Sequence, residues 1–178
     1  YLIFGSSVKA ALFVNVLFFL IFAYFFYKLI SRLADKTTAV LSLVVVSTMP
    51  LFYGLVRNFF VEFGLMSIFF GWLYYFYKSE DLTIRKYLFL MGIFTGFGFL
   101  MKFHFFLYIA LPIGISLLTR MRKGEFKALS VDLLYFAIPA FLLASPWYFK
   151  NILTVLWHVK RATNPELLGP YYFGNPFS

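Results

Sequence analysis

Long apolar runs make up most of the chain, and short polar or charged stretches separate them. Each run is close to the roughly 20 residues that a helix needs to cross a bilayer. The pattern predicts an all-α, polytopic membrane protein with about six spans in one transmembrane domain over residues 1–178. The expected spans cover residues 8–30, 38–55, 60–77, 84–101, 103–119 and 131–148.

The composition agrees with a membrane location. Hydrophobic residues form 62% of the chain and charged residues only 13%, whereas soluble domains have about 45–50% apolar and about 25% charged residues. The chain contains no cysteine, which excludes disulfides and thiolate metal sites within it. It begins with Tyr1 and not with methionine, so we expect a fragment of a longer chain.

The basic residues fall into two groups of loops, and this division predicts the topology. The net charge is +9, but the basic residues are scattered between apolar spans, so we expect no nucleic-acid partner. The positive-inside rule places the larger group in the cytoplasm. That group comprises Lys28, Arg32, Lys36, Lys78, Arg85, Lys86, Arg120, Arg122, Lys123 and Lys127. The smaller group comprises Lys9, Arg57, Lys102, Lys150, Lys160 and Arg161.

This topology also fixes where the apolar stretches divide. The basic loops on either side of residues 87–119 belong to the same group, so an even number of spans must lie between them. We therefore expect two short spans there, joined by a tight turn at Lys102. The same reasoning divides residues 38–77 between Arg57 and Glu62, and it places these charges on the non-cytoplasmic face.

Arg57 and Glu62 are the first candidates for function. A charge at hydrocarbon depth costs at least ~2.5–3.5 kcal/mol on insertion scales, so such residues often mark a working site. Glu62 suits a general base or a ligand of a divalent cation, and the use of a metal stays open. Arg57 suits bidentate contact with a phosphate, and it can converge with Glu62 if the chain turns at Asn58. The alternative is a structural ion pair or two loop charges that extend to the membrane surface.

Two further candidates follow a glycine-rich span. Lys102 can hold a phosphate as a point charge, or it can simply extend from a helix end. His104 can titrate near neutrality and contact a substrate, or it can be an ordinary polar loop residue. Gly92 and Gly96 have the small-xxx-small spacing of close helix packing, and we expect that structural role for them.

The end of the last span supplies the remaining candidates. Pro146 is expected to break the helix there. Tyr148 suits an interfacial anchor or a substrate contact, and Lys150 and Asn151 can project toward a lipid headgroup or a sugar. Residues 149–178 are rich in turn residues and are expected to form a non-cytoplasmic loop.

Several common catalytic motifs are absent from the sequence. It contains no G-x-x-x-x-G-K-[ST] phosphate loop, no H-E-x-x-H and no G-x-S-x-G. An enzyme with this sequence would not bind a nucleotide through a Walker loop, so its donor is expected to arrive through the bilayer.

Three segments carry a family resemblance. They are S-T-M-P-L-F-Y-G-L-V-R-N-F-F-V-E-F-G-L-M-S-I-F-F, G-I-F-T-G-F-G-F-L-M-K-F and S-P-W-Y-F-K-N, in this order. Together they resemble the polytopic GT-C glycosyltransferases, particularly the branch with protein O-mannosyltransferases and lipid A aminoarabinose transferases. The resemblance implies a GT-C-like fold and transfer of a sugar from a polyprenyl-phosphate donor. It also implies a site on the non-cytoplasmic face of the plasma (inner) membrane, with membrane lipid as a partner.

The resemblance also implies roles for single residues. Glu62 matches the family's second acidic residue, Arg57 the preceding arginine and Lys102 the basic residue after the glycine-rich span. Glu62 is thereby expected to be catalytic, and Arg57 and Lys102 to bind the donor phosphate. The family's first outer-loop acidic residue would precede Val8, and residues 1–7 contain no acid.

Two other functions fit the same charges. A transporter or flippase for an anionic lipid would use them as a translocation site and would expose them to each face in turn. A non-catalytic membrane subunit would use them in assembly.

Overall fold

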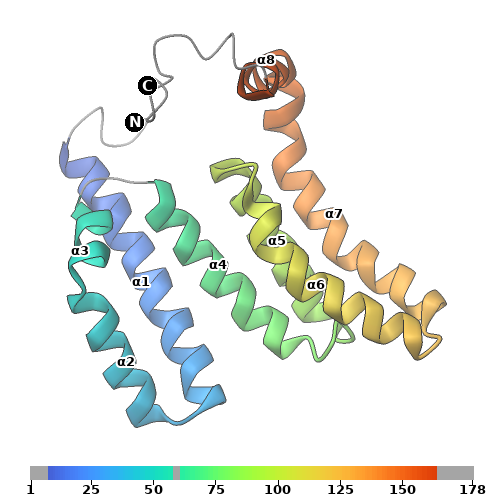
Figure 1. Cartoon of the computed structure of the whole chain (residues 1–178), viewed down its shortest axis with the longest axis horizontal. Coiled ribbons are helices and arrows are strands. Elements are labelled where there is room, and N and C mark those ends of the chain that lie inside the picture. The colour runs from blue at the N-terminus through green and yellow to red at the C-terminus, as the bar shows by residue number, and fades with distance from the viewer. Residues whose placement is uncertain (1–7, 58–60, 164–178) are drawn as a thin grey trace, which may run out of the picture. The chain divides into compact units, whose positions relative to one another are not determined.

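The described part of the chain is mainly helical. The computed structural model describes residues 8–57 and 61–163, and no strand occurs among them. The helices are α1 (Val8–Leu33), α2 (Lys36–Thr48), α3 (Pro50–Arg57), α4 (Val61–Lys78), α5 (Arg85–Met101), α6 (Phe105–Arg122), α7 (Phe126–Lys150) and α8 (Ile152–Thr163) (Figure 1). The predicted all-α class is confirmed.

A proline divides the second predicted span. α2 and α3 meet at a bend of 72° between Thr48 and Pro50. Pro50 has no N–H to donate into a helix, and it disfavours helical backbone at the residue before it. Met49 accordingly adopts extended backbone, with φ −64° and ψ 132°. The predicted span over residues 38–55 thus consists of two helices that meet at a bend.

The expected number of spans is not confirmed. By length and composition, three of the described helices suffice to cross a membrane: Ala10–Leu33, Phe105–Arg122 and Phe126–Lys150. The bent pair of α2 and α3 would make four if it forms one span. About six spans remains a prediction, to which α4 and α5 would contribute the other two.

The helix break expected at Pro146 does not occur. α7 continues through Pro139 and Pro146 and ends at Lys150. Proline is tolerated inside membrane helices because neighbouring groups and small local adjustments satisfy the freed backbone carbonyls. Part of the predicted loop after Tyr148 is helical, since α8 covers Ile152–Thr163. The turn-rich tail from residue 164 onward lies outside the described residues.

Aromatic side chains form the core of the first of two compact units. This unit extends to Leu143, and the second begins at Ala144. In the first, α1 packs against α4, and α4 packs against α5. Phe22, Phe63 and Trp72 are fully buried there, and the ring of Phe22 lies 5.0 Å from that of Phe52. In a bilayer such packing stabilises mainly through close van der Waals contact, because lipid is as apolar as the side chains.

Two glycines of α5 allow α7 to approach closely. A Cβ atom added to Gly92 would collide with the backbone carbonyl oxygen of Phe136 and the ring of Pro139. A Cβ atom on Gly96 would lie 2.7 Å from that of Leu143. The predicted structural role of the small-xxx-small pair is thus confirmed.

We expect Gly92→Ala to lower the free energy of unfolding by about 1–3 kcal/mol, because the added methyl group meets backbone atoms that cannot rotate away. Thermal unfolding of the detergent-solubilised protein measures the change. Gly114→Ala in α6 is the matched control, since nothing lies within 4 Å of its added Cβ atom. Equal stability of the two variants would contradict the close approach of α5 and α7.

Candidate functional site

Two of the predicted site residues, Glu62 and Lys102, are in contact although they lie 40 positions apart in the sequence. The Nζ atom of Lys102 donates a hydrogen bond of 2.7 Å to Oε1 of Glu62. Glu62 lies in the first turn of α4, and Lys102 follows the last residue of α5. Because the two helices pack together and run in opposite directions, the start of one lies beside the end of the other.

The turn that carries Lys102 is set by its neighbours. Lys102 adopts extended backbone, with φ −156°, and its N–H donates to the carbonyl of Gly98. Phe105 begins α6 with a fully buried ring, which lies where a side chain at position 98 would be. The predicted tight turn at Lys102 is confirmed, and it depends on the absence of a side chain at Gly98.

The ion pair is accessible from outside the protein. The side chains of Glu62 and Lys102 are 48% and 41% exposed. The hydrogen bond to the Glu62 carboxylate raises the pKa of Lys102, because it stabilises the ammonium form. An ion pair this exposed contributes little to stability, because water competes for both charges. Both groups can therefore exchange this bond for a bond to a ligand at low cost.

An apolar cavity lies beside Glu62. Its volume is about 290 Å³, and it is open to the outside. Among the described residues that line it, Glu62 is the one with a charge, and the others are Leu65, Met66, Phe69, Phe70 and Tyr108. The cavity thus has a hydrocarbon-like wall from α4 and α6, and Glu62 lies at one end of this wall.

Arg57 is placed only by its backbone. It is the last residue of α3, whereas α4 begins at Val61, so Arg57 and Glu62 do not share one unbroken helix. The side-chain amide of Asn15 in α1 donates to the carbonyl of Val56 and so ties the end of α3 to α1. The predicted convergence of the Arg57 and Glu62 side chains at Asn58 lies outside the described residues.

The other predicted candidates occupy helix ends. His104 precedes α6, and its ring centroid lies 3.8 Å from that of Phe103. Tyr148, Lys150 and Asn151 belong to the second unit, whereas Glu62 belongs to the first. The side-chain amide of Asn151 donates to the carbonyl of Trp147 at 2.9 Å, which satisfies an acceptor near the end of α7.

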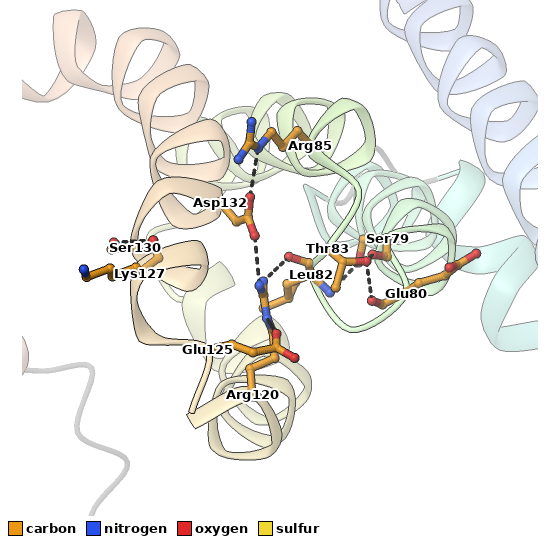
Figure 2. Close-up of polar contacts among 10 residues, drawn as sticks. All are labelled: Ser79, Glu80, Leu82, Thr83, Arg85, Arg120, Glu125, Lys127, Ser130 and Asp132. Carbon is orange, nitrogen blue, oxygen red and sulfur yellow. Dashed lines mark hydrogen bonds and ion pairs between the residues drawn. The ribbon is translucent and has the colours of Figure 1, made fainter. Parts of the chain in front are cut away.

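Sequence reasoning missed a buried cluster around Arg120, which Figure 2 shows. The Arg120 side chain is 3% exposed and forms ion pairs of 2.9 Å with Glu125 and with Asp132. It also donates to the carbonyl of Leu82, and Asp132 accepts a further bond of 3.0 Å from Arg85. Arg120 and Arg85 were interpreted only as markers of the cytoplasmic side. Asp132 is an acid at the start of a predicted span, so the cost argument applied to Glu62 would have found it.

The same cluster holds the loop between α4 and α5 in an unusual conformation. Glu80, Asp81 and Leu82 have φ values of 49°, 56° and 65°, a left-handed backbone that costs roughly 1–3 kcal/mol for each residue other than glycine. The Ser79 hydroxyl accepts from the N–H of Leu82 at 3.3 Å, while Arg120 binds the Leu82 carbonyl. We infer that these contacts offset the strain of the loop.

The described residues do not form a metal site by themselves. Among residues 8–57 and 61–163, no three histidine, aspartate or glutamate side chains gather where one ion could bind. Glu62 offers a single carboxylate, and that carboxylate is paired with Lys102.

Fold and site together define a helical membrane protein with a carboxylate–ammonium pair beside an apolar cavity. Comparison with known families narrows this class. The model of the dolichyl-phosphate-mannose-protein mannosyltransferase family matches residues 1–149. The chain belongs to this family of membrane glycosyltransferases, which confirms the resemblance to GT-C enzymes. No curated protein and no solved structure matches the chain.

We expect Asp132→Ala to lower the free energy of unfolding by about 3–5 kcal/mol, because it removes a buried partner of Arg120. Glu125→Ala is the matched control and should cost less than about 1 kcal/mol, since that carboxylate is partly exposed. Thermal unfolding in detergent measures both changes. Replacing the pair by Arg120→Met and Asp132→Leu should recover most of the lost stability. A double variant as unstable as Asp132→Ala would show that the unpaired charge is not the cause.

Proposed function

We propose that the protein transfers a sugar from a polyprenyl-phosphate donor to an acceptor hydroxyl at the non-cytoplasmic face of the membrane. The observation that carries the proposal is the exposed Glu62–Lys102 pair beside an apolar cavity. Membership of a mannosyltransferase family gives the reaction class. The donor, the face and the roles of single residues are our inferences.

The proposed reaction exchanges one bond to the sugar for another. The acceptor hydroxyl attacks the anomeric carbon, and the bond from this carbon to the phosphate oxygen breaks. The lipid phosphate leaves with the electron pair, and Lys102 stabilises its charge electrostatically. Glu62 accepts the hydroxyl proton or orients the hydroxyl. We propose that Arg57 binds the same phosphate, as the sequence predicts.

The apolar cavity supports a donor that arrives through the bilayer. A lipid-linked donor needs a polar site for its phosphate and an apolar path for the adjacent hydrocarbon. Glu62 lies at the cavity wall, and Leu65 and Phe69 continue that wall along α4. His104, Tyr148, Lys150 and Asn151 remain proposed contacts for the sugar or the acceptor.

The positions of the charges along α4 support a site on the non-cytoplasmic face. α4 has 18 residues, which span about 27 Å at 1.5 Å per residue. This length is close to the roughly 30 Å thickness of the hydrocarbon core. Glu62 and the Arg120 cluster lie toward opposite ends of α4, since Leu82 follows its last residue by a few positions. The Arg120 cluster contains members of the larger basic group, which the positive-inside rule assigns to the cytoplasm.

We expect Lys102→Gln and Glu62→Gln each to lower kcat/KM about 10²-fold, because each removes a group that stabilises the transition state. The assay measures transfer from a labelled polyprenyl-phosphate sugar by the full-length protein in vesicles. Lys123→Gln, at the other end of α6, is a matched control with the same loss of charge and should keep full activity. Full transfer by Glu62→Gln and by Arg57→Ala would refute the proposed site.

Thiol labelling tests the face directly, and the lack of cysteine in this chain makes it simple. We expect a membrane-impermeant reagent to modify Lys102→Cys only from the non-cytoplasmic side, and Lys123→Cys only from the cytoplasmic side. The reagent is applied to intact cells and to inverted vesicles. Reaction of Lys102→Cys from both sides would instead indicate a transporter.

A further inference from the structure

α8 follows α7 after a single residue. α7 ends at Lys150 and α8 begins at Ile152. Figure 1 shows α8 almost end on, whereas the last turns of α7 run across the view, so the chain turns sharply at Asn151. The Asn151 amide caps the Trp147 carbonyl, and the Asn151 carbonyl accepts from the N–H of Val155. α8 lies beyond the residues that the mannosyltransferase family matches.

The apolar residues of α8 gather on one side and are exposed. At about 100° per residue, Ile152, Val155 and Leu156 lie on one face, and Thr154 lies opposite Leu156. Leu156 is 57% exposed and Leu153, at the edge of this face, is 79% exposed. Exposed leucines on one side of a helix require an apolar environment to cover them.

The end of α7 indicates which environment this is. α7 has 25 residues and is apolar enough to cross a membrane, and its length of about 37 Å exceeds the hydrocarbon thickness. Trp147 and Tyr148 in its last turns are the residue types that mark the membrane–water interface. One residue spans at most about 3.8 Å, so α8 would begin at the level of the lipid headgroups if α7 crosses the membrane.

We propose that α8 is an interfacial helix that lies in the headgroup layer and buries its Leu153–Leu156 side in the outer acyl chains. Lys160 lies one turn after Leu156 on the same side of the helix, and its long side chain would extend from the acyl chains to anionic lipid phosphates. The lipid surface is thus the binding partner of α8. This proposal does not depend on the proposed transferase reaction.

Site-directed spin labelling tests the proposal. A nitroxide is attached to Leu156→Cys or to Thr154→Cys in the otherwise cysteine-free chain, in the protein reconstituted into vesicles of phosphatidylcholine and phosphatidylglycerol. Its collisions with oxygen, which concentrates in the acyl region, and with a water-soluble nickel chelate are then measured. We expect the ratio of oxygen to chelate collisions to be several-fold higher at position 156 than at 154. Leu153→Cys provides a second apolar position if labelling at 156 disturbs the fold.

Two results would overturn the proposal. High chelate access at both 156 and 154 would place the helix in water. Low access of both reagents to 156 and to 153 would mean that another protein segment or a partner protein covers the apolar face. The transfer assay is independent of either result, so a failed proposal for α8 leaves the test of Glu62 and Lys102 unaffected.

Discussion

The buried guanidinium group of Arg120 organises one end of the first unit, because it needs hydrogen-bond and ion-pair partners. Removing a charge from water costs several kcal/mol unless other groups replace its hydration. Arg120 meets this need with a carboxylate from α7, a carboxylate from the α6–α7 turn and a carbonyl from the α4–α5 loop. These partners come from three separate segments, so satisfying one side chain fixes the ends of four helices. The opposite end of α4 carries a charge pair that is half exposed and contributes little to stability. A rigid end and an adjustable end thus coexist on the same helices.

Much of the fold could be predicted because apolar periodicity and charge distribution are local features of the sequence. The tight turn at Lys102 followed from counting spans, and the close helix contact at Gly92 followed from residue spacing. From the sequence, Glu62 and Lys102 could be placed only on the same face of the membrane, and their contact could not be predicted. Their 2.7 Å contact depends on the packing of α4 against α5, which is a tertiary property. The Arg120 cluster was missed because the positive-inside rule already explained the positions of its basic residues.

Proline shows why local rules failed at two positions. Pro50 was expected near the end of the second span, and it divides that span into two helices with a bend of 72°. Pro146 was expected to end a helix, and α7 continues through it to Lys150. Pro50 is the first residue of α3, where a missing N–H costs nothing. Pro146 lies in a long apolar helix whose other turns maintain its direction. The effect of a proline on the backbone therefore depends on its position in the helix.

The Glu62–Lys102 pair means that the site holds an anion of its own. A ligand whose anionic group reaches Lys102 replaces a carboxylate that already occupies the ammonium, so its binding is an exchange of one anion for another. A neutral sugar offers no charge to replace that carboxylate and must compete with a bond of 2.7 Å. A phosphate brings several acceptor oxygens and can bind the ammonium while the released carboxylate turns to another donor. In the proposed site, the pair would therefore favour an anionic ligand over an uncharged one, by no more than the small stability of an exposed ion pair.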